Sequence, residues 1–479
     1  MKTMMRTSLL AVLMCSAASG ALAQTADERI AALEAKVAAL TGELSAVTGE
    51  LASLKASTTK AEQDIKKIAA PAATTTISAA RPTIATSDGQ KFAVRALAQF
   101  DAAAYDEDKP GSDLNSGTNF RRARLGVEGT FGKTWNYALT GEFGGSGSES
   151  ATLNQAYVEY TGWKPASVPV RLRLGAWATP TGLEDATSNT EALFLERAAI
   201  AELVRNISGG DGRSGAGVFA NGERWYASAV LTGAIAGAPA APEFDEQVGY
   251  LTRVAFRPLG DKDWAIHVGA NVQGVLKVTD TGAGAVRTRQ VRLRERPELR
   301  VDGTRLVDTG NLNATGVTAW GAELGANYRN LQVSAEAFRI EVERPSVFDP
   351  SFDGWYVQGA WTVTGEQHAW SAQNGGFKGI KPKANFNPAE NAWGAVEIAA
   401  RYSVLDLDDH AGAVGAAAPA GGVRGGEQKI ASAVLNWYPN PVFRFQLQYQ
   451  RVDVDRLSAA GVEVGDDVDI LSLRSQFAF

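Results

Sequence analysis

Cysteine is almost absent from this chain of 479 residues: the sequence contains one, Cys15. It lies in the segment 1–23, which begins with basic residues, continues through an apolar run and ends in a small-x-small sequence. This arrangement is typical of a secretory signal peptide that is cleaved after export. The mature chain is therefore expected to lack disulfides, a thiol nucleophile and cysteine metal ligands.

Long apolar runs and excess positive charge are also lacking. Beyond residue 23, no apolar stretch approaches the length of about 18 residues that a membrane-spanning helix requires. The whole chain has 47 basic and 53 acidic residues, and the signal segment contains two of the basic and none of the acidic ones, so the mature formal charge is −8. This balance argues against a nucleic-acid partner. It leaves a membrane β-barrel open, because the strands of such a barrel are only half apolar.

Histidine is scarce, and its spacing excludes the common metal and catalytic patterns. His267, His368 and His410 form no paired metal motif, and surface or rim positions are expected for them. No Ser-His-Asp set stands out. The acid-rich stretches 405–410 and 452–456 suit a divalent cation, a bridge to lipopolysaccharide or, more commonly, a solvated rim. The sequence thus predicts no catalytic residue, no metal site and no cofactor.

What is present begins with a heptad pattern in the segment 24–69. Apolar residues recur at spacings of 3 and 4 over more than five heptads, from Ile30 through Leu54 to Ile68. The pattern predicts a helix of about 60 Å. It favours a coiled coil, and hence an oligomer, over a lone amphipathic helix packed on a domain. The following segment, 70–90, is rich in Ala, Thr, Ser and Pro and is interpreted as a linker.

From residue 91 to residue 479 the sequence alternates apolar and polar side chains in segments of roughly ten residues. In 443–450, for example, Phe, Leu and Tyr alternate with Arg and Gln. About 16 such segments are counted. A soluble β-sandwich rarely needs that many strands in one unit. The predicted fold is therefore all-β: a transmembrane antiparallel β-barrel of about 16 strands with its apolar face toward lipid, preceded by the N-terminal α-helical coiled coil.

The connections between these segments alternate in length, as expected for short periplasmic turns and long outer loops. Asn221-Gly222 and Arg329-Asn330 are short turns, whereas 102–118 and 178–212 are long and polar. One connection, 365–391, is long where a short turn is due. Either a strand is miscounted there or this segment folds back against the barrel.

Arginines carry the strongest functional signal. Arg122 and Arg124 share one face of a strand, and Arg171 and Arg173 share one face of another, each opposite apolar residues. These four are expected to point into the lumen, because an arginine at the bilayer midplane costs about 2 to 4 kcal/mol. Alternatively, they simply pair with inward acids such as Glu128. A second basic cluster in 281–309 suits either anion collection near the pore mouth or an ordinary salt-bridged loop; its members are Arg287, Arg289, Arg292, Arg294, Arg296 and Arg300.

The barrel region resembles the phosphate-selective porin O and P family. The resemblance rests on "FRRARLGVEGTFGKTWNYAL" (120–139), "GWYVQGAWTVTGE" (354–366), "LNWYPNPVFRFQLQYQRVDVDR" (435–456) and "LRSQFAF" (473–479). It implies a trimeric outer-membrane channel with inward arginines and a third loop, 178–212, folded into the pore. Arg205 and Arg213 are then further candidates for pore-lining residues at that loop. The terminal Phe479 resembles the signal by which outer-membrane barrels are handed to their assembly machinery.

We therefore expect a passive porin in the outer membrane of a Gram-negative bacterium, with its coiled coil in the periplasm and outer-membrane lipid around the barrel. The expected permeants are small anions, phosphate or related oxyanions, passing an arginine-lined pore. Two alternatives remain: a general non-selective porin, and a structural or tethering protein that uses its coiled coil. A soluble periplasmic enzyme is the least favoured interpretation.

Overall fold

A computed structural model describes residues 26–68, 73–78, 81–86, 88–108, 112–145, 152–236, 246–278, 290–345 and 347–479. The expected signal segment 1–23 and two members of the basic cluster, Arg287 and Arg289, lie outside the described residues. The chain divides into two compact units, 1–72 and 73–479. Each unit is described by itself.

The first unit contains one long helix, α1 (Ala26–Ile68), which confirms the helix that the heptads predict. Its apolar seam is uncovered in a single chain: Ile30, Leu44 and Leu54 are 53 to 68% exposed. Such a seam on an otherwise polar helix suits a partner helix, so the coiled coil stays a prediction. Among the described residues, no helix has the length and hydropathy needed to cross a membrane.

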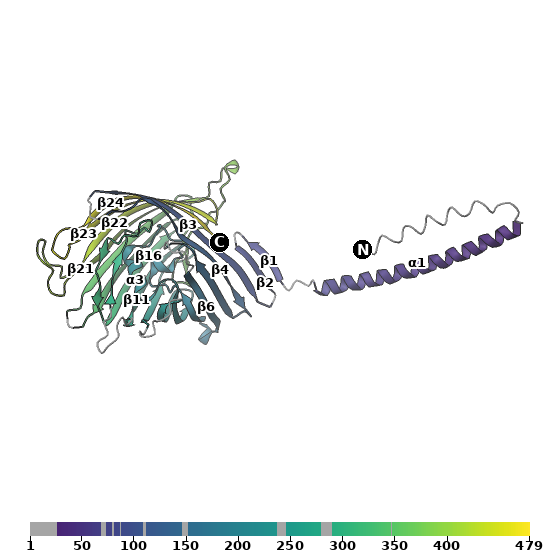
Figure 1. Cartoon of the computed structure of the whole chain (residues 1–479), viewed down its shortest axis with the longest axis horizontal. Helices are drawn as coiled ribbons and strands as arrows, with labels where there is room; N and C mark the ends of the chain where they lie inside the picture. The colour runs from purple at the N-terminus through teal and green to yellow at the C-terminus, as the bar shows by residue number, and fades with distance from the viewer. Residues whose placement is uncertain are drawn as a thin grey trace. The chain divides into compact units, whose positions relative to one another are not determined.

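The second unit is a closed β-barrel of 16 antiparallel strands (Figure 1). Each strand pairs with the next along the chain, and the last strand pairs with the first over 11 residue pairs, from Val468–Glu107 to Ala478–Leu97. This confirms the predicted fold and strand number. The strands are β3 (Lys91–Glu107), β4 (Gly117–Phe131), β5 (Trp135–Glu142), β6 (Thr152–Trp163), β7 (Val170–Trp177), β8 (Arg213–Asn221), β9 (Trp225–Ile235), β10 (Val248–Phe256), β11 (Trp264–Lys277), β16 (Gly316–Tyr328), β17 (Leu331–Glu343), β18 (Ser351–Thr362), β21 (Ala395–Asp409), β22 (Val423–Tyr438), β23 (Phe443–Asp455) and β24 (Asp466–Ala478).

Two further short strands precede the barrel, β1 (Ala73–Ser78) and β2 (Arg81–Thr86). They form a hairpin, and β2 also pairs with the first residues of β3. This differs from the linker expected over 70–90. The Thr-rich sequence is too poor in large apolar groups to form a core, but β-branched residues suit a strand that is added to an existing sheet edge.

The barrel wall has the predicted polarity over most of its height. Leu125, Leu139 and Leu174 are more than half exposed on the outer face, whereas Gln99 and Gln448 are fully buried inside. The inner face of β21–β24 departs from this pattern near the long loops, where it carries Leu405, Leu407, Ile430, Val452, Val454, Val468 and Ile470, all buried. These residues form an internal apolar core with chain segments that fold into the lumen.

The two ends of the barrel differ as the sequence predicts. At the short-turn end, Lys133 and Arg329 adopt positive φ angles of 70° and 53°, as tight hairpins require. The connection from β6 to β7 contains a short 3-10 helix, η1 (Pro165–Ser167). Long connections leave the opposite end, which we call the long-loop end.

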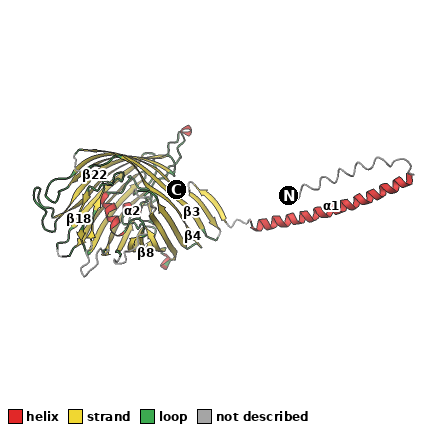
Figure 2. Ribbon diagram, in the orientation of Figure 1, coloured by secondary structure: helices red, strands yellow, loops and turns green. Residues whose placement is uncertain are grey.

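Three segments fold into the lumen. The first, called the inner loop, is 178–212 and contains α2 (Leu183–Ala186) and α3 (Ala199–Ser208); Figure 2 shows its helical part inside the ring of strands. The second, called the inner hairpins, is 290–313 and contains β12 (Gln290–Val291), β13 (Arg294–Glu295), β14 (Val307–Asp308) and β15 (Leu312–Asn313). The third, called the end plug, is 365–391 and contains β19 (Trp370–Ser371), β20 (Gly376–Phe377) and η2 (Pro388–Glu390).

The end plug is the long connection 365–391 for which the sequence left two alternatives. No strand is miscounted there, because β18 pairs directly with β21, and the segment folds back into the barrel. The Arg253 guanidinium of β10 donates to the carbonyl oxygens of Asn374 and Gly375 at 2.8 and 2.6 Å. On the other side, His368 Nε2 lies 2.5 Å from a carboxylate oxygen of Glu397 on β21.

The expected surface or rim positions of the histidines were wrong for two of the three. His267 is fully buried, where it contacts Glu323 Oε2 at 3.0 Å and accepts a hydrogen bond from Trp370 of the end plug at 3.1 Å. His368 is also buried, whereas His410 is exposed on a loop. The prediction was wrong because the end plug covers these side chains inside the barrel, and the alternation of apolar and polar residues along the strands does not predict such a segment.

Candidate pore and its constriction

The inner loop is held across the lumen by side chains from several distant strands. The Arg474 guanidinium donates to the carbonyl oxygen of Leu195, and Gln448 Oε1 accepts the amide hydrogen of Leu195 at 3.0 Å. On β17, the carboxylate of Glu336 accepts the amide hydrogens of Leu183 and Glu184 at 2.7 and 2.9 Å. Because side chains of β17, β23 and β24 bind its backbone, the inner loop is anchored inside the barrel.

Glu196 of the inner loop lies at the centre of a cluster of arginines. Its carboxylate contacts Arg121 at 2.7 Å, Arg474 at 2.9 Å and Arg122 at 3.3 Å. Asp101 also pairs with Arg474 at 2.6 Å, so two carboxylates face three guanidinium groups and this cluster retains excess positive charge. The excess holds the pKa of Glu196 well below its usual range, although burial by itself would raise it.

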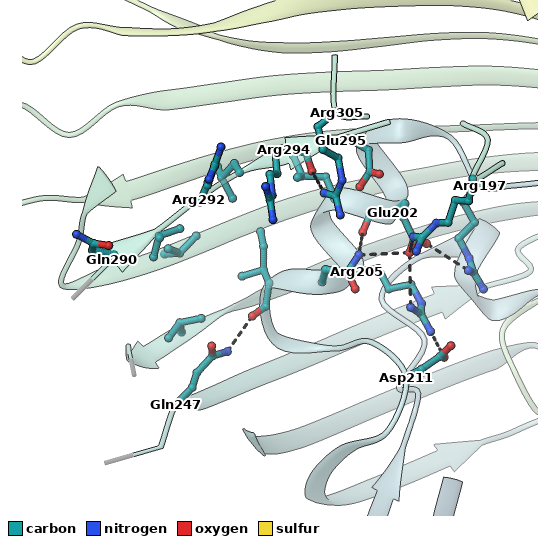
Figure 3. Close-up of a pocket in the computed structure, with 18 of the residues that line it drawn as sticks. Arg197, Glu202, Arg205, Asp211, Gln247, Gln290, Arg292, Arg294, Glu295 and Arg305 are labelled. Atoms are coloured by element: carbon teal, nitrogen blue, oxygen red, sulfur yellow. Dashed lines mark hydrogen bonds and ion pairs between the residues drawn. The ribbon is translucent and has the colours of Figure 1, made fainter. Parts of the chain in front are cut away.

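A cavity of about 520 Å³ lies at the long-loop end, between the inner loop and the inner hairpins. We call it the long-loop cavity. Among the described residues, eight arginines and three acids line it: Arg121, Arg122, Arg197, Arg205, Arg292, Arg294, Arg300 and Arg305, with Glu202, Asp211 and Glu295. Several of these side chains are drawn in Figure 3.

A second cavity, of about 610 Å³, lies toward the short-turn end and is called the short-turn cavity. Its lining also carries more basic than acidic residues among those described: Arg81, Arg95, Arg124, Arg197, Arg205, Lys381 and Arg444, with Asp185, Glu191 and Asp211. Both cavities therefore present a positive lining to a permeating ion.

Arg197, Arg205 and Asp211 line both cavities and therefore lie between them. Arg205 contacts Asp185 at 2.8 Å and also pairs with Asp211; Figure 3 shows the latter pair beside Glu202. Arg197 contacts Asp185 at 2.9 Å. We call these three side chains the constriction, because they lie where the linings of the two cavities meet.

Arginines at and beside the constriction lower the pKa values of two carboxylates, Glu202 and Asp211. Burial would raise the pKa of Glu202, but Arg300, Arg205 and Arg197 hold it at about 2. Burial opposes ionisation of Asp211 in the same way, yet Arg205 and Arg124 hold its pKa well below the usual range. These carboxylates consequently stay ionised at neutral pH and remain paired.

The structure brings two of the four strand arginines predicted to line the pore into the cavities. Arg122 is buried beside the long-loop cavity and donates to Gln99 at 2.7 Å. Arg124 lines the short-turn cavity, where it contacts Glu142 at 2.5 Å and Asp211 at 2.7 Å.

Arg171 and Arg173 line neither cavity. Arg171 instead donates to the carbonyl oxygen of Gln373 in the end plug at 2.8 Å. They share Glu159, which accepts from Arg173 at 2.6 Å and lies 4.0 Å from Arg171. The Arg173 guanidinium also lies 4.1 Å from the ring centroid of Tyr157.

The two arginines predicted to line the pore at the third loop, Arg205 and Arg213, differ. Arg205 belongs to the constriction. Arg213 lies in neither cavity lining, and its guanidinium donates to the carbonyl oxygens of Gly209 and Gly233 at 2.6 and 2.9 Å. Its contacts tie the end of the inner loop to β9.

Sequence reasoning missed Arg197 and Arg305 and left the cluster in 281–309 open between two roles. In the described part of that cluster, Arg292 and Arg300 are paired with Asp308 and Glu202, as in a salt-bridged loop. Arg294 lines the long-loop cavity without such a pair among the described residues, so anion collection stays a prediction. Excess arginine over acid within 292–305 was the available signal. Loop residues have no period-2 face, so the sequence could not say which of them point inward.

Known proteins are similar to this chain over the barrel region. The family model of the phosphate-selective porin O and P matches residues 92–479. Porin O of Pseudomonas aeruginosa is 26% identical over 383 residues, which cover 75% of this chain and 82% of that protein. An uncharacterized protein of Caulobacter vibrioides is 26% identical over 390 residues, 77% of this chain and 70% of that protein.

Solved structures of porins are similar at lower identity. The trimer form of OmpT, an outer membrane protein of Vibrio cholerae, is 12% identical with a TM-score of 0.49 and covers 82% of this chain and 100% of its own. An anion-selective porin from Comamonas acidovorans is 11% identical with a TM-score of 0.47, covering 81% and 100%. Because the family match spans the whole barrel, from β3 through the arginine-rich cavities to the closing strand, this chain belongs to the phosphate-selective porin O and P family.

Proposed function

We propose that this outer-membrane porin allows passive diffusion of small anions, phosphate or related oxyanions among them, and that it catalyses no reaction. The observation that carries the proposal is the excess of basic over acidic residues in both cavities. Within a Debye length of about 8 to 10 Å these charges overlap, so an anion meets a continuous positive lining.

Arginine suits this task for two further reasons. Its guanidinium donates two parallel hydrogen bonds to an oxyanion, and its charge does not titrate at working pH. The acids of the constriction moderate the attraction, since a site that binds too tightly would block its own conduction.

A general non-selective porin is the second candidate, and a specific observation favours it. Each of the four strand arginines lies close to a carboxylate, namely Glu196, Glu142 or Glu159. Crossed charges of this kind stabilise a wide pore without choosing between ions. The anion-preferring proposal therefore depends on the arginines that exceed the acids, above all those of the constriction and the long-loop cavity.

The assembly that we propose is a homotrimer surrounded by outer-membrane lipid, with α1 in the periplasm. A partnered α1 would cover its exposed apolar seam. The related OmpT structure is described as a trimer, which makes three chains our first choice.

Planar-bilayer conductance of the purified full chain tests the proposal. Discrete steps with an anion-biased reversal potential are expected. Replacing Arg122, Arg124, Arg171 and Arg173 together by Gln should lower the anion-to-cation permeability ratio and weaken block of chloride current by phosphate. Arg339→Gln, which removes one arginine charge outside the lumen, is the control, because this arginine is half exposed on the outer wall, where it pairs with Glu341 and Asp353.

Each alternative has its own outcome in this experiment. An unbiased reversal potential in the unaltered protein identifies a general porin. An unchanged ratio in the fourfold variant identifies those arginines as paired scaffolding. Absence of single-channel steps, with a folded barrel, would favour the tethering protein.

A further inference from the structure

The long-loop cavity combines arginines with an apolar wall. Val275 and Val317 are paired neighbours on the adjacent strands β11 and β16, and their side chains point into the lumen. Ile207 of α3 and Leu293 of the inner hairpins belong to the same apolar cluster and line the same cavity. A channel that served only a hydrated inorganic anion would gain nothing from this wall, because apolar side chains offer no hydrogen bonds to it.

Two arginines at this wall have no carboxylate partner among the described residues. Arg294 and Arg305 both line the cavity and lie side by side on the inner hairpins, since Arg305 Nη1 donates to the carbonyl oxygen of Arg294 at 2.9 Å. Their neighbours differ: Arg292 contacts both carboxylate oxygens of Asp308, and Arg300 contacts Glu202 at 2.6 Å. Arg294 and Arg305 thus remain available to an incoming anion.

The two arginines, Arg294 and Arg305, lie beside the apolar wall of the cavity, and Arg294 is also next to it in the chain. Leu293 precedes Arg294, and Val291 packs against the same apolar cluster. A ligand whose anionic group bound Arg294 and Arg305 could therefore place a short apolar portion against Val275, Val291 and Leu293. The cavity volume of about 520 Å³ is ample for a molecule of this size.

We infer that the long-loop cavity is a binding site for organic anions that carry an apolar portion, such as short carboxylates, and that it prefers them to inorganic phosphate. Arg294 and Arg305 bind the anionic group, and the apolar wall receives the chain. This inference rests on the proposed anion channel and names a substrate class for it.

The test measures block of chloride current through the reconstituted full chain by acetate, butyrate and hexanoate at fixed ionic strength and pH 7, with inorganic phosphate in a separate series. The three carboxylates have the same charge, so they differ only in apolar length. The half-blocking concentration should fall roughly two- to fourfold for each added methylene. Hexanoate should block at a lower concentration than phosphate.

Two variants separate the parts of the site. Arg294→Gln with Arg305→Gln should raise the half-blocking concentration of all three carboxylates by roughly tenfold or more. Val291→Asn, at a partly buried position, should flatten the dependence on chain length and leave acetate unchanged. Arg339→Gln, which removes one arginine charge on the outer wall, again serves as the control, and it should leave the series as in the unaltered protein.

Equal block by all three carboxylates, or stronger block by phosphate than by hexanoate, would overturn the inference even if a variant failed to fold, because both are measured on the unaltered protein. The reversal potential distinguishes this failure from that of the proposed function. If it is anion-biased while the carboxylate series is flat, only the organic-anion site is wrong. If it is unbiased, the anion channel itself is wrong.

Discussion

At the scale of single residues, the constriction places opposite charges within contact distance of each other. Removing the positive one and removing the negative one should therefore have opposite effects. Arg205→Gln should lower the anion-to-cation permeability ratio and Asp211→Asn should raise it. Each change should be about fivefold, since a unit charge about 4 Å from a permeating ion contributes about 1 kcal/mol in water. Reversal potentials in a salt gradient measure both, and shifts of the same sign would show that the pair does not act on the ion directly.

Glu295 gives the long-loop cavity a pH dependence. Its buried carboxylate accepts a backbone hydrogen bond from Arg296 at 3.0 Å, and burial raises its pKa above the usual value while Arg300 opposes the shift. Glu295 consequently takes up a proton at a higher pH than an ordinary glutamate, and protonation removes a negative charge from the lining. Glu202, with a pKa of about 2, stays ionised over the same range.

Anion preference should therefore rise as the pH falls from 7 toward 5. Glu295→Gln should show the higher preference already at pH 7 and a weaker dependence on pH. Reversal potentials at pH 5, 6 and 7 provide the measurement, and Glu341→Gln, at a half-exposed position on the outer wall, is the control. An identical pH profile in the Glu295 variant would assign the dependence to other groups.

At the scale of elements, the end plug is separable from the wall that it fills. β18 and β21 pair directly as far as Thr362 and Glu397, so the barrel does not need residues 365–391 for closure. Replacing 366–391 by a short Asn-Gly turn should raise single-channel conductance, because the plug backbone no longer occupies the space beside Arg253. Anion bias should remain, since Arg197 and Arg205 belong to the inner loop. Unchanged conductance with a correctly folded barrel would place the narrowest point elsewhere.

The helix α1 is a second separable element, since it forms a compact unit distinct from 73–479. Deleting 26–68 should leave a barrel that still shows heat-modifiable migration on a gel, because no barrel strand is removed. Chemical crosslinking should then show weaker oligomers if the heptads hold the chains together. Loss of heat modifiability would mean that barrel folding requires the helix, contrary to this prediction.

At the scale of the whole molecule, closure depends on the last strand. The backbone of Phe479 exchanges two hydrogen bonds of 3.0 Å with Ala96 of β3, and its ring lies 5.3 Å from that of Phe477. Replacing Phe479 by Gln should reduce the amount of barrel in the outer membrane more than the amount synthesised, if the barrel-assembly machinery reads this residue. Fractionation against total protein measures the ratio. Phe92→Gln, on the outer face of the first strand, is a control for the loss of an exposed aromatic.

The sequence by itself determined the helix and the strands of this protein. Heptad spacing predicts α1, and period-2 alternation predicts 16 barrel strands and which side chains face inward, because both patterns follow from local backbone geometry. The alternation over 467–479 predicts that the last strand closes the barrel, and the register between Val468 and Glu107 bears this out.

Only the tertiary structure decided which inward arginines meet an acid and which have no acidic partner among the described residues. Arg474 contacts Asp101 and Glu196 across separations of 373 and 278 residues, and the buried positions of His267 and His368 depend on a plug contributed by a distant turn. The contact between Arg474 and Asp101 depends on closure of the barrel, which pairs these residues across β24 and β3. The contacts of Glu196, His267 and His368 depend on segments that leave the strands and fold into the lumen. Loops have no fixed periodicity, so their direction is set by the partners that they find inside the closed barrel.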